Sequence, residues 1–226
     1  SAVYKRPPPA PGDLVTAPPA KTRRGLLISV DGPGAVGKST MVAALTTELR
    51  ARREAVWSTR EPTDTPLGNL ARHGTEEYRG MPMACLIAAD RYQHLTTEIA
   101  PALLRGEIVL CDRYIASSLV LQRMDGLDPH VIWDLNRHAR LPHLALLLIA
   151  DPDTIAARLA CRGAHSRYER IPHSSHIEHT LYADAATFLR GIGVRVRELD
   201  ATTADPGTLA RTAAAEITAL RTRDRP

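Results

Sequence analysis

Residues 31–40 read DGPGAVGKST, and this stretch decides the fold. It follows an apolar run at residues 26–30 and precedes a segment of helical periodicity. Gly32, Gly37, Lys38 and Ser39 match G-x-x-x-x-G-K-[ST], the phosphate-binding loop (P-loop), in its strand–loop–helix setting. Glycine permits the positive φ values with which backbone N–H groups converge on phosphate oxygens, and the start of a helix adds its positive dipole. The stretch therefore predicts a nucleotide-binding loop.

The same glycines also fit a second pattern. Gly32, Gly34 and Gly37 spell G-x-G-x-x-G, the fingerprint of dinucleotide-binding Rossmann folds. That reading expects an acidic residue about 20 positions further on, and acidic residues flank the next predicted strand. The Lys-Ser pair directly after the last glycine nevertheless favours the phosphate loop, because a dinucleotide site does not need it.

From residue 25 onward, short apolar runs alternate with longer segments of helical period. We predict strands at residues 26–30, 55–59, 108–111, 144–149 and 194–199. We predict helices at residues 39–53, 83–105, 115–122, 129–140, 152–162, 176–190 and 206–221. Asp128, Asp151 and Asp205 each precede a proline, which is typical of a helix N-cap. The alternation predicts an α/β P-loop NTPase fold, a five-stranded parallel sheet flanked by helices, with a short lid.

The net charge of +4 is concentrated at the start of the chain. Residues 1–24 contain Lys5, Arg6, Lys21, Arg23, Arg24 and one acid, Asp13, so residues 25–226 carry no net charge. Because residues 1–24 are also rich in proline, we predict a disordered basic extension there and one domain over residues 25–226. A neutral domain offers no basic stripe, so we expect no nucleic-acid partner.

Lysine is used sparingly in this chain. Among the 29 lysines and arginines, only Lys5, Lys21 and Lys38 are lysine. A compact ammonium on a flexible stem suits the phosphate loop better than a planar guanidinium, which explains Lys38. The absence of any later lysine also excludes the Asn/Thr-Lys-x-Asp element with which GTPases read guanine.

Composition argues against a membrane or secreted protein. The longest apolar run, residues 144–150, is far shorter than the roughly 18 residues that a membrane span needs. The chain opens without a secretory signal pattern, and an odd number of cysteines does not suggest a disulfide framework. We therefore expect a cytoplasmic protein with no membrane contact. Cys85, Cys111 and Cys161 lie in apolar segments, and we expect them to be buried, inert thiols.

Charged residues follow the predicted strands where a ligand is expected. The apolar residues 108–111 end at Asp112, a position typical of an acid that holds Mg²⁺. Arg60 and Arg113 lie just past two strand ends, where open α/β sheets place their ligands. A second phosphate-binding centre beside the loop is what a phosphotransferase needs.

Several further motifs follow in order along the chain. They are TREP at residues 59–62, ADRYQH at 89–94, DRYI at 112–115, SS at 117–118, LP at 141–142, RG at 162–163 and RYE at 167–169. With the phosphate loop, these pieces make residues 25–200 resemble the thymidylate kinase family of nucleoside monophosphate kinases. The resemblance implies transfer of the γ-phosphate of ATP to dTMP or a closely related pyrimidine nucleoside monophosphate. It also implies Mg²⁺ as cofactor, nucleotides as the small-molecule partners, and a homodimer.

The resemblance assigns roles to particular residues. The ATP-binding residues would be Gly32, Pro33, Gly34, Ala35, Val36, Gly37, Lys38, Ser39, Thr40 and Arg162. Ser39 and Asp112 would hold the metal, and the catalytic residues would be Lys38, Asp112, Arg113 and Arg167. The acceptor-binding residues would be Arg60, Ile87, Arg91, Arg113, Ser118, Leu121 and Gln122, with Arg60, Arg91 and Arg113 clamping the monophosphate.

The resemblance implies that the transition-state arginine comes either from the loop or from a lid at about residues 162–174. Because residues 33–36 of the loop include no basic side chain, the resemblance implies the lid as its source. Arg162, Arg167 and Arg170 are the candidates, with Arg167 as the first choice.

Three positions depart from the family pattern, all on the acceptor side. Ile87 replaces a stacking aromatic, Gly34 a carboxylate near the sugar 3′-hydroxyl, and Leu121 a tyrosine that crowds a ribose 2′-hydroxyl. An aliphatic side chain at Ile87 can still pack against a pyrimidine, and we expect it to lose about 0.5–1.5 kcal/mol of aromatic preference. A kinase for a pyrimidine nucleotide with altered base or sugar is therefore one alternative. The alternative from another class is a nucleotide-binding regulatory module without transfer activity, which the intact loop and arginines disfavour.

Overall fold

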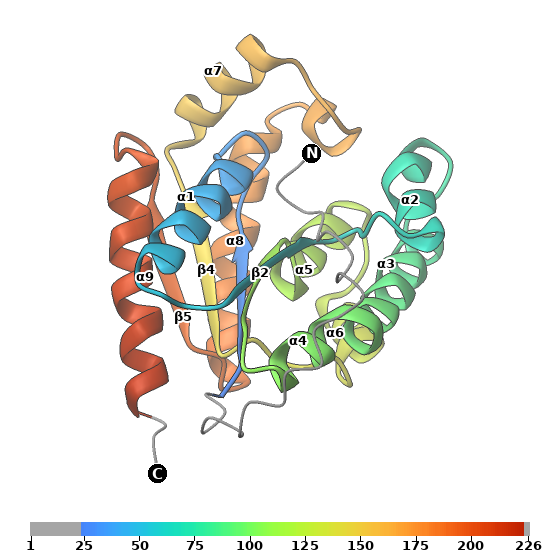
Figure 1. The fold of residues 1–226 in the computed structure, drawn as a ribbon. Coiled ribbons are helices and arrows are strands. Elements are labelled where there is room, and N and C mark those ends of the chain that lie inside the picture. Colours follow the sequence, from blue (N-terminus) through green and yellow to red (C-terminus); the bar gives the residue numbers. More distant parts are fainter. Residues whose placement is uncertain (1–23, 224–226) are drawn as a thin grey trace.

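The computed structural model describes residues 24–223, so the extension predicted for residues 1–24 lies outside the described residues except for Arg24. Helices and strands alternate along this part of the chain (Figure 1). The strands are β1 (Leu26–Asp31), β2 (Val56–Arg60), β3 (Ile108–Asp112), β4 (Leu144–Ile149) and β5 (Val196–Asp200). The α-helices are α1 (Lys38–Ala51), α2 (Pro66–His73), α3 (Met81–His94), α4 (Ala100–Leu104), α5 (Ile115–Met124), α6 (Pro129–Asn136), α7 (Pro152–Arg162), α8 (Ser174–Gly191) and α9 (Pro206–Arg223). Short 3₁₀ helices occur at η2 (Gly74–Glu76) and η4 (Tyr168–Arg170), and η3 (Leu95–Ile99) is a π-helical segment between α3 and α4.

The five strands form one parallel sheet in the order β2-β3-β1-β4-β5, which confirms the predicted fold class. Strand β1 lies in the middle, between β3 and β4. The direction in which successive strands are added therefore reverses at β1, and ligands of open α/β sheets bind at the carboxyl ends of strands beside such a point. The register pairs Asp112 with both Val30 and Arg60, so the ends of β1, β2 and β3 meet at one edge.

Two apolar cores lie on opposite faces of the sheet. Along β1, Leu26, Ile28 and Val30 face the core shared with α1 and α9, whereas Leu27 faces the core shared with α5 and α8. This alternation is the period of two expected for a strand buried on both sides. Figure 1 shows α1 and α9 side by side and α3, α4 and α6 grouped away from them. Helices therefore cover both faces of the sheet.

The predicted elements agree with the structure in most places. Each predicted strand is confirmed to within two residues at its ends. The N-cap predictions are also confirmed, since the carboxylates of Asp128, Asp151 and Asp205 accept hydrogen bonds from backbone N–H groups of the following turn. Helix α2 was not predicted, although Thr65 before Pro66 forms the same cap by accepting from Gly68 N at 3.2 Å.

Two expectations are corrected by the structure. Helix α6 ends at Asn136 and not at residue 140. At this end the Asn136 side chain accepts a hydrogen bond from Arg91, and the Leu135 carbonyl accepts one from the Tyr92 hydroxyl. Of the cysteines, Cys111 is buried in β3, but Cys85 and Cys161 are exposed because they lie on the outer faces of α3 and α7. Among the described residues, no helix has the length and apolar character needed to cross a membrane.

Candidate active site

The loop between β1 and α1 has the backbone that its glycines predict. Gly37 has φ = 101°, and a Cβ at this position would meet no other atom of the described chain. Glycine is therefore needed here for its backbone conformation and not for lack of space. Gly32 is limited by space as well, since a Cβ there would lie 2.5 Å from the Leu148 carbonyl oxygen. The loop opens into the first turn of α1 beside the central strand, the arrangement that binds phosphate through backbone N–H groups.

Lys38 lies in this loop with its ammonium folded onto the backbone. Its Nζ donates to the carbonyl oxygens of Gly32 at 2.9 Å and Pro33 at 2.6 Å. Burial, together with the nearby Arg113 guanidinium, lowers the pKa of Lys38 to about 7 from its ordinary value of 10.5. A phosphate anion arriving in the loop would restore the charged form, so the side chain is poised for an anionic ligand.

Ser39 and Asp112 meet at the floor of the site. Ser39 Oγ donates to Asp112 Oδ2 at 2.7 Å, which joins the first turn of α1 to the end of β3. A hydroxyl and a carboxylate form an all-oxygen donor set of the kind that Mg²⁺ prefers when it also binds substrate phosphates. The residues present therefore fit the metal predicted for this position.

Three arginines form a second cationic centre. Arg60 and Arg113, both predicted, lie beside Arg72, which was not predicted from the sequence. Burial and the neighbouring Arg60 lower the pKa of Arg72, which is the effect of like charges held close together. Arg113 is placed by an unusual backbone, with φ = 70° at a non-glycine residue, and its Nη1 has no hydrogen-bond partner among the described residues. An unpaired buried donor beside two further cations predicts an anion at this place.

One cavity of about 640 Å³ joins the loop to the arginines. Its polar lining includes six basic side chains, Lys38, Arg60, Arg72, Arg113, Arg158 and Arg162, against three acids, Glu61, Asp112 and Glu169. Apolar side chains of Met83, Ile87 and Leu121 line the cavity as well, together with Gln122. The excess of positive charge suits two phosphate-bearing ligands, and the apolar wall suits a base.

Gln122 is the polar group on that wall. It is almost fully buried, and its Oε1 accepts no hydrogen bond within the described part of the chain. A buried acceptor without a donor is costly, so a residue of this kind on a cavity lining favours a ligand that donates to it. Ile87, Leu121 and Gln122 thus line the same cavity as the loop and the arginines, and their predicted contact with the acceptor stays a prediction.

Arg91 and Ser118 lie behind the wall and do not line the cavity. Arg91 is buried, with Nε donating to Glu61 Oε2 at 2.8 Å, Nη2 to Ser118 Oγ at 3.0 Å and Nη1 to Asn136 Oδ1. Its guanidinium also lies over the Tyr114 ring. In this structure Arg91, on α3, connects the residue after β2 with α5 and α6, and its predicted contact with the acceptor phosphate stays a prediction.

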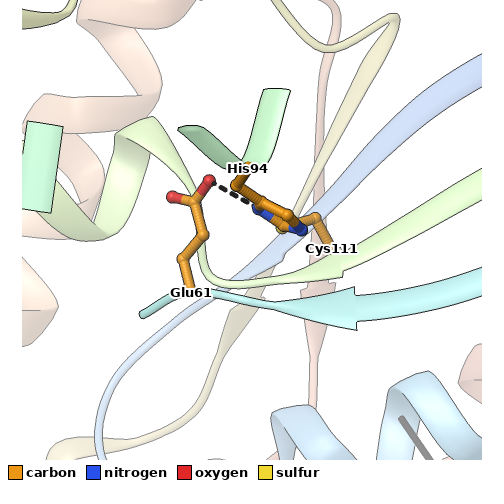
Figure 2. Close-up of side chains that lie close together, drawn as sticks. All are labelled: Glu61, His94 and Cys111. Carbon is orange, nitrogen blue, oxygen red and sulfur yellow. Dashed lines mark hydrogen bonds and ion pairs between the residues drawn. The ribbon is translucent and has the colours of Figure 1, made fainter. Parts of the chain in front are cut away.

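Next to Arg91, three buried side chains could be taken for a metal site (Figure 2). Ligand atoms of Glu61, His94 and Cys111 lie within 4.8 Å of one another, and His94 Nδ1 is 3.2 Å from Glu61 Oε1. The other Glu61 oxygen is bonded to the Arg91 guanidinium, whose charge opposes a divalent cation. Burial, with the Glu61 charge, raises the pKa of Cys111 well above its ordinary value and so disfavours the thiolate that a metal requires. The cluster is therefore better explained as a network that orients Glu61 and Arg91.

The three lid arginines have different surroundings. Arg162 lines the cavity, and its Nη2 donates to Glu169 Oε2 at 2.7 Å. Arg167 makes a two-pronged ion pair with Asp125, and exposed Arg170 pairs with Glu76. Only Arg162 of the three lies on the cavity wall.

Two glutamates lie against Gly34, the loop position that lacks the usual carboxylate. A Cβ on Gly34 would be 2.5 Å from Glu169 Oε1, so the lid carboxylate occupies the space of a side chain at that position. Gly34 N donates to Glu178 Oε2 at 3.0 Å, and burial raises the pKa of Glu178 although Lys38 and Arg113 oppose the shift. Neither glutamate was predicted, because each comes from the segment around the lid, more than 130 residues from the loop.

A phosphate loop and a second anion centre on one cavity, with Arg162 beside them, are the arrangement of a P-loop nucleoside monophosphate kinase. The family model described as "Thymidylate kinase" matches residues 30–202. This chain belongs to the thymidylate kinase family.

Curated relatives of this chain carry the name thymidylate kinase. The chain is 40% identical over 141 residues to "Thymidylate kinase" of Xanthomonas oryzae pv. oryzae, covering 62% of each chain. It is 41% identical over 157 residues to "Thymidylate kinase" of Leifsonia xyli subsp. xyli, covering 66% of this chain and 74% of the relative. It is 36% identical over 149 residues to "Probable thymidylate kinase" of Caldivirga maquilingensis, covering 64% and 73%.

Proposed function

We propose that the protein transfers the γ-phosphate of ATP to the 5′-phosphate of dTMP, producing ADP and the nucleoside diphosphate. The observation that carries this proposal is the single cavity with Lys38 and the loop at one end and the unpaired Arg113 donor beside Arg60 and Arg72 at the other. Family membership and the names of the relatives point to the same substrate.

The donor phosphates would lie on the amides of residues 32–40, with Lys38 released from the loop carbonyls to contact the β- and γ-phosphates. Ser39 and Asp112 would hold Mg²⁺, which would neutralise part of the negative charge of these phosphates. The acceptor monophosphate would take the place between Arg60, Arg72 and Arg113, which brings two anions together against their repulsion.

The apolar wall would receive the pyrimidine. Ile87, Leu121 and Met83 would pack against the ring, and Gln122 Oε1 would accept from the N3–H of thymine. Thymine and uracil offer an N–H donor at N3 that pairs with Oε1 as it is placed here, whereas cytosine would need the Gln122 amide turned so that Nε2 donates to N3. Arg91 and Ser118 would act from behind, by holding the wall in place.

Arg162 is the lid arginine that the geometry favours for the transition state, because it lines the cavity while Arg167 is bonded to Asp125. We expect Arg162→Ala to lower kcat by about 10³-fold or more with little change in ADP affinity. The exposed Arg170→Ala is the matched control. Equal losses in both variants would remove the distinction between them.

The test of the proposed function is ADP release measured with a panel of dTMP, dUMP, dCMP, UMP, CMP and 5-substituted pyrimidine monophosphates. We expect release to depend on the acceptor and to be fastest with dTMP. A faster base-modified or sugar-modified acceptor would favour the specialised kinase suggested by Gly34, Ile87 and Leu121. Release that never depends on an acceptor would contradict transfer and leave a regulatory module.

Homodimerisation and a cytoplasmic location stay predictions of the family resemblance and of composition.

A further inference from the structure

Asp125, the residue after α5, has more partners than its place at a helix end requires. Its side chain is 2% exposed, and its two oxygens accept from Arg167 Nη1 and Nη2, each at 2.5 Å. Asp125 Oδ2 also accepts from the Tyr168 hydroxyl and from Gly80 N, both at 3.1 Å. Two-pronged bonds between arginine and carboxylate are among the strongest and most directional contacts available.

These bonds connect the lid to the wall expected to bind the acceptor. Gly80 is the N-cap of α3, which carries Met83 and Ile87, and Asp125 follows directly on α5, which carries Leu121 and Gln122. Arg167 and Tyr168 belong to the lid. One buried carboxylate thus joins three segments that meet only through the folded structure.

Tyr168 is the side chain that this arrangement presents to the cavity. It lines the cavity and is the one Phe, Tyr or Trp among its lining residues in the described chain. Its ring is covered by the Arg167 guanidinium, 4.1 Å from the ring centroid. The hydrogen bond to Asp125 and the Arg167 guanidinium hold the ring in place. Tyr168 thus supplies an aromatic surface to a cavity in which Ile87 stands where the family pattern has an aromatic.

Glu169, the residue after Tyr168, connects the Asp125 contacts to the phosphate loop. Glu169 lies against Gly34 and accepts from Arg162, so fixing residues 167 and 168 also fixes where Glu169 and Arg162 meet the loop. We propose that Asp125 is a positioning residue that seats the lid on the acceptor wall and sets Tyr168 and Arg162 in the geometry used for transfer. The kinetic part of this inference rests on the proposed function.

The experiment compares wild type with Asp125→Ala, Asp125→Asn, Arg167→Ala and the double variant Asp125→Ala/Arg167→Ala. Hydrogen exchange of lid residues 163–173 is read by mass spectrometry, together with kcat, KM for dTMP and the affinity for ADP. We expect faster exchange confined to the lid and kcat lower by about tenfold to a hundredfold, because small misplacements near the reacting groups have effects of this size. ADP affinity should stay within about twofold, and the double variant should lose no more than the worse single variant.

Asp184→Asn is the matched control, since Asp184 pairs with Arg123 near Asp125 but is exposed and does not line the cavity. It should leave lid exchange and kcat unchanged. If Asp125→Ala does not fold, Asp125→Asn and Tyr168→Phe test the same contacts with smaller changes.

Unchanged lid exchange in the Asp125 variants would overturn the proposal. An increase in kcat would overturn it too, because it would mean that Asp125 restrains a catalytic Arg167. If wild type phosphorylates no nucleotide, the proposed function fails, whereas lid exchange still decides whether Asp125 seats the lid.

Discussion

Gly34 shows how one residue in the loop depends on a distant segment. Its missing side chain leaves room for Glu169, and its N–H is bonded to Glu178. From the sequence, Gly34 appeared only as the loss of a carboxylate. In the structure, a carboxylate is present at that place but is contributed by the lid.

We expect Gly34→Ala to lower kcat by roughly tenfold to a hundredfold, since the new Cβ would displace Glu169 and with it the Arg162 contact. Steady-state kinetics with saturating ATP and dTMP measures this. Gly191→Ala, at the end of α8 with open space around its Cβ, is the glycine control and should be neutral. Normal turnover in Gly34→Ala would mean that Glu169 has no part in placing Arg162.

Lys38 predicts a proton linkage of nucleotide binding. Its pKa is about 7 in the free protein, and bound phosphates would raise it. At pH 8, ADP binding should therefore take up protons, and affinity should fall as the pH rises above about 7. Calorimetry in buffers of different ionisation enthalpy measures the uptake.

Glu178→Gln provides a second arm of that measurement. The Glu178 carboxylate raises the pKa of Lys38, so removing its charge should shift proton uptake toward lower pH while the amide oxygen still accepts from Gly34 N. Proton release, or no exchange at any pH between 6 and 9, would contradict the linkage.

At the scale of residues, the loop and the strand-end arginines could be predicted because their chemistry is local to a motif. Ser39 and Asp112 likewise follow from a strand–loop–helix pattern and a strand end. Arg72, Glu169 and Glu178 could not be predicted, because only the folded chain brings α2, the lid and α8 to the loop. The motif around Arg91 could be recognised in the sequence, but its buried position could not be predicted, because its hydrogen bonds include one to Asn136 from α6.

Helix α7 is the element that leads from β4 into the lid. Few of its side chains are buried, Ile155 being the one fully buried, so its stability depends strongly on its first turn. There Asp151 Oδ1 accepts from the N–H groups of Asp153 and Thr154 at 3.0 and 3.1 Å.

We expect Asp151→Ala to lower the free energy of unfolding by about 1 kcal/mol, the usual value of an N-cap. Urea denaturation measures it. Asp151→Asn keeps a capping oxygen and should lose only a few tenths of that amount. Equal destabilisation by both variants would show that the charge, and not the cap, is what α7 uses.

Elements were predictable where proline and a capping residue mark a start. The same signal, a threonine before Pro66, was present for α2 but lay in a segment with little apolar periodicity. The end of α6 was not predictable, because it depends on distant side chains: the Tyr92 hydroxyl from α3 donates to the Leu135 carbonyl at the end of the helix, and the Tyr114 hydroxyl donates to the Arg140 carbonyl beyond it.

Across the whole molecule, Arg221 joins the last helix to two distant segments. Arg221 belongs to α9. Its Nη1 donates at 2.6 Å to Oε2 of Glu54, which precedes β2, and its Nη2 donates to the carbonyl of Gly106, which precedes β3. Both charged side chains are 6% exposed. The pair therefore secures the edge of the sheet opposite the site.

We expect Arg221→Ala to reduce the free energy of unfolding by about 3–5 kcal/mol, because it leaves the Glu54 charge buried without this partner. Arg221→Met/Glu54→Leu should recover much of the loss, since it removes both charges. Chemical denaturation compares the two, and a single variant as stable as wild type would show that water or other groups replace Arg221.

The two cores on opposite faces of the sheet have an evolutionary consequence. Helix α1, which follows the phosphate loop, packs in one core, whereas α5 and the segments around α3 and α8 pack in the other. Substitutions on α3 and α5 that reshape the pocket wall for a new base therefore leave the packing around α1 intact. Such a division lets descendants of one ancestral enzyme change what they phosphorylate without having to rebuild how they use ATP.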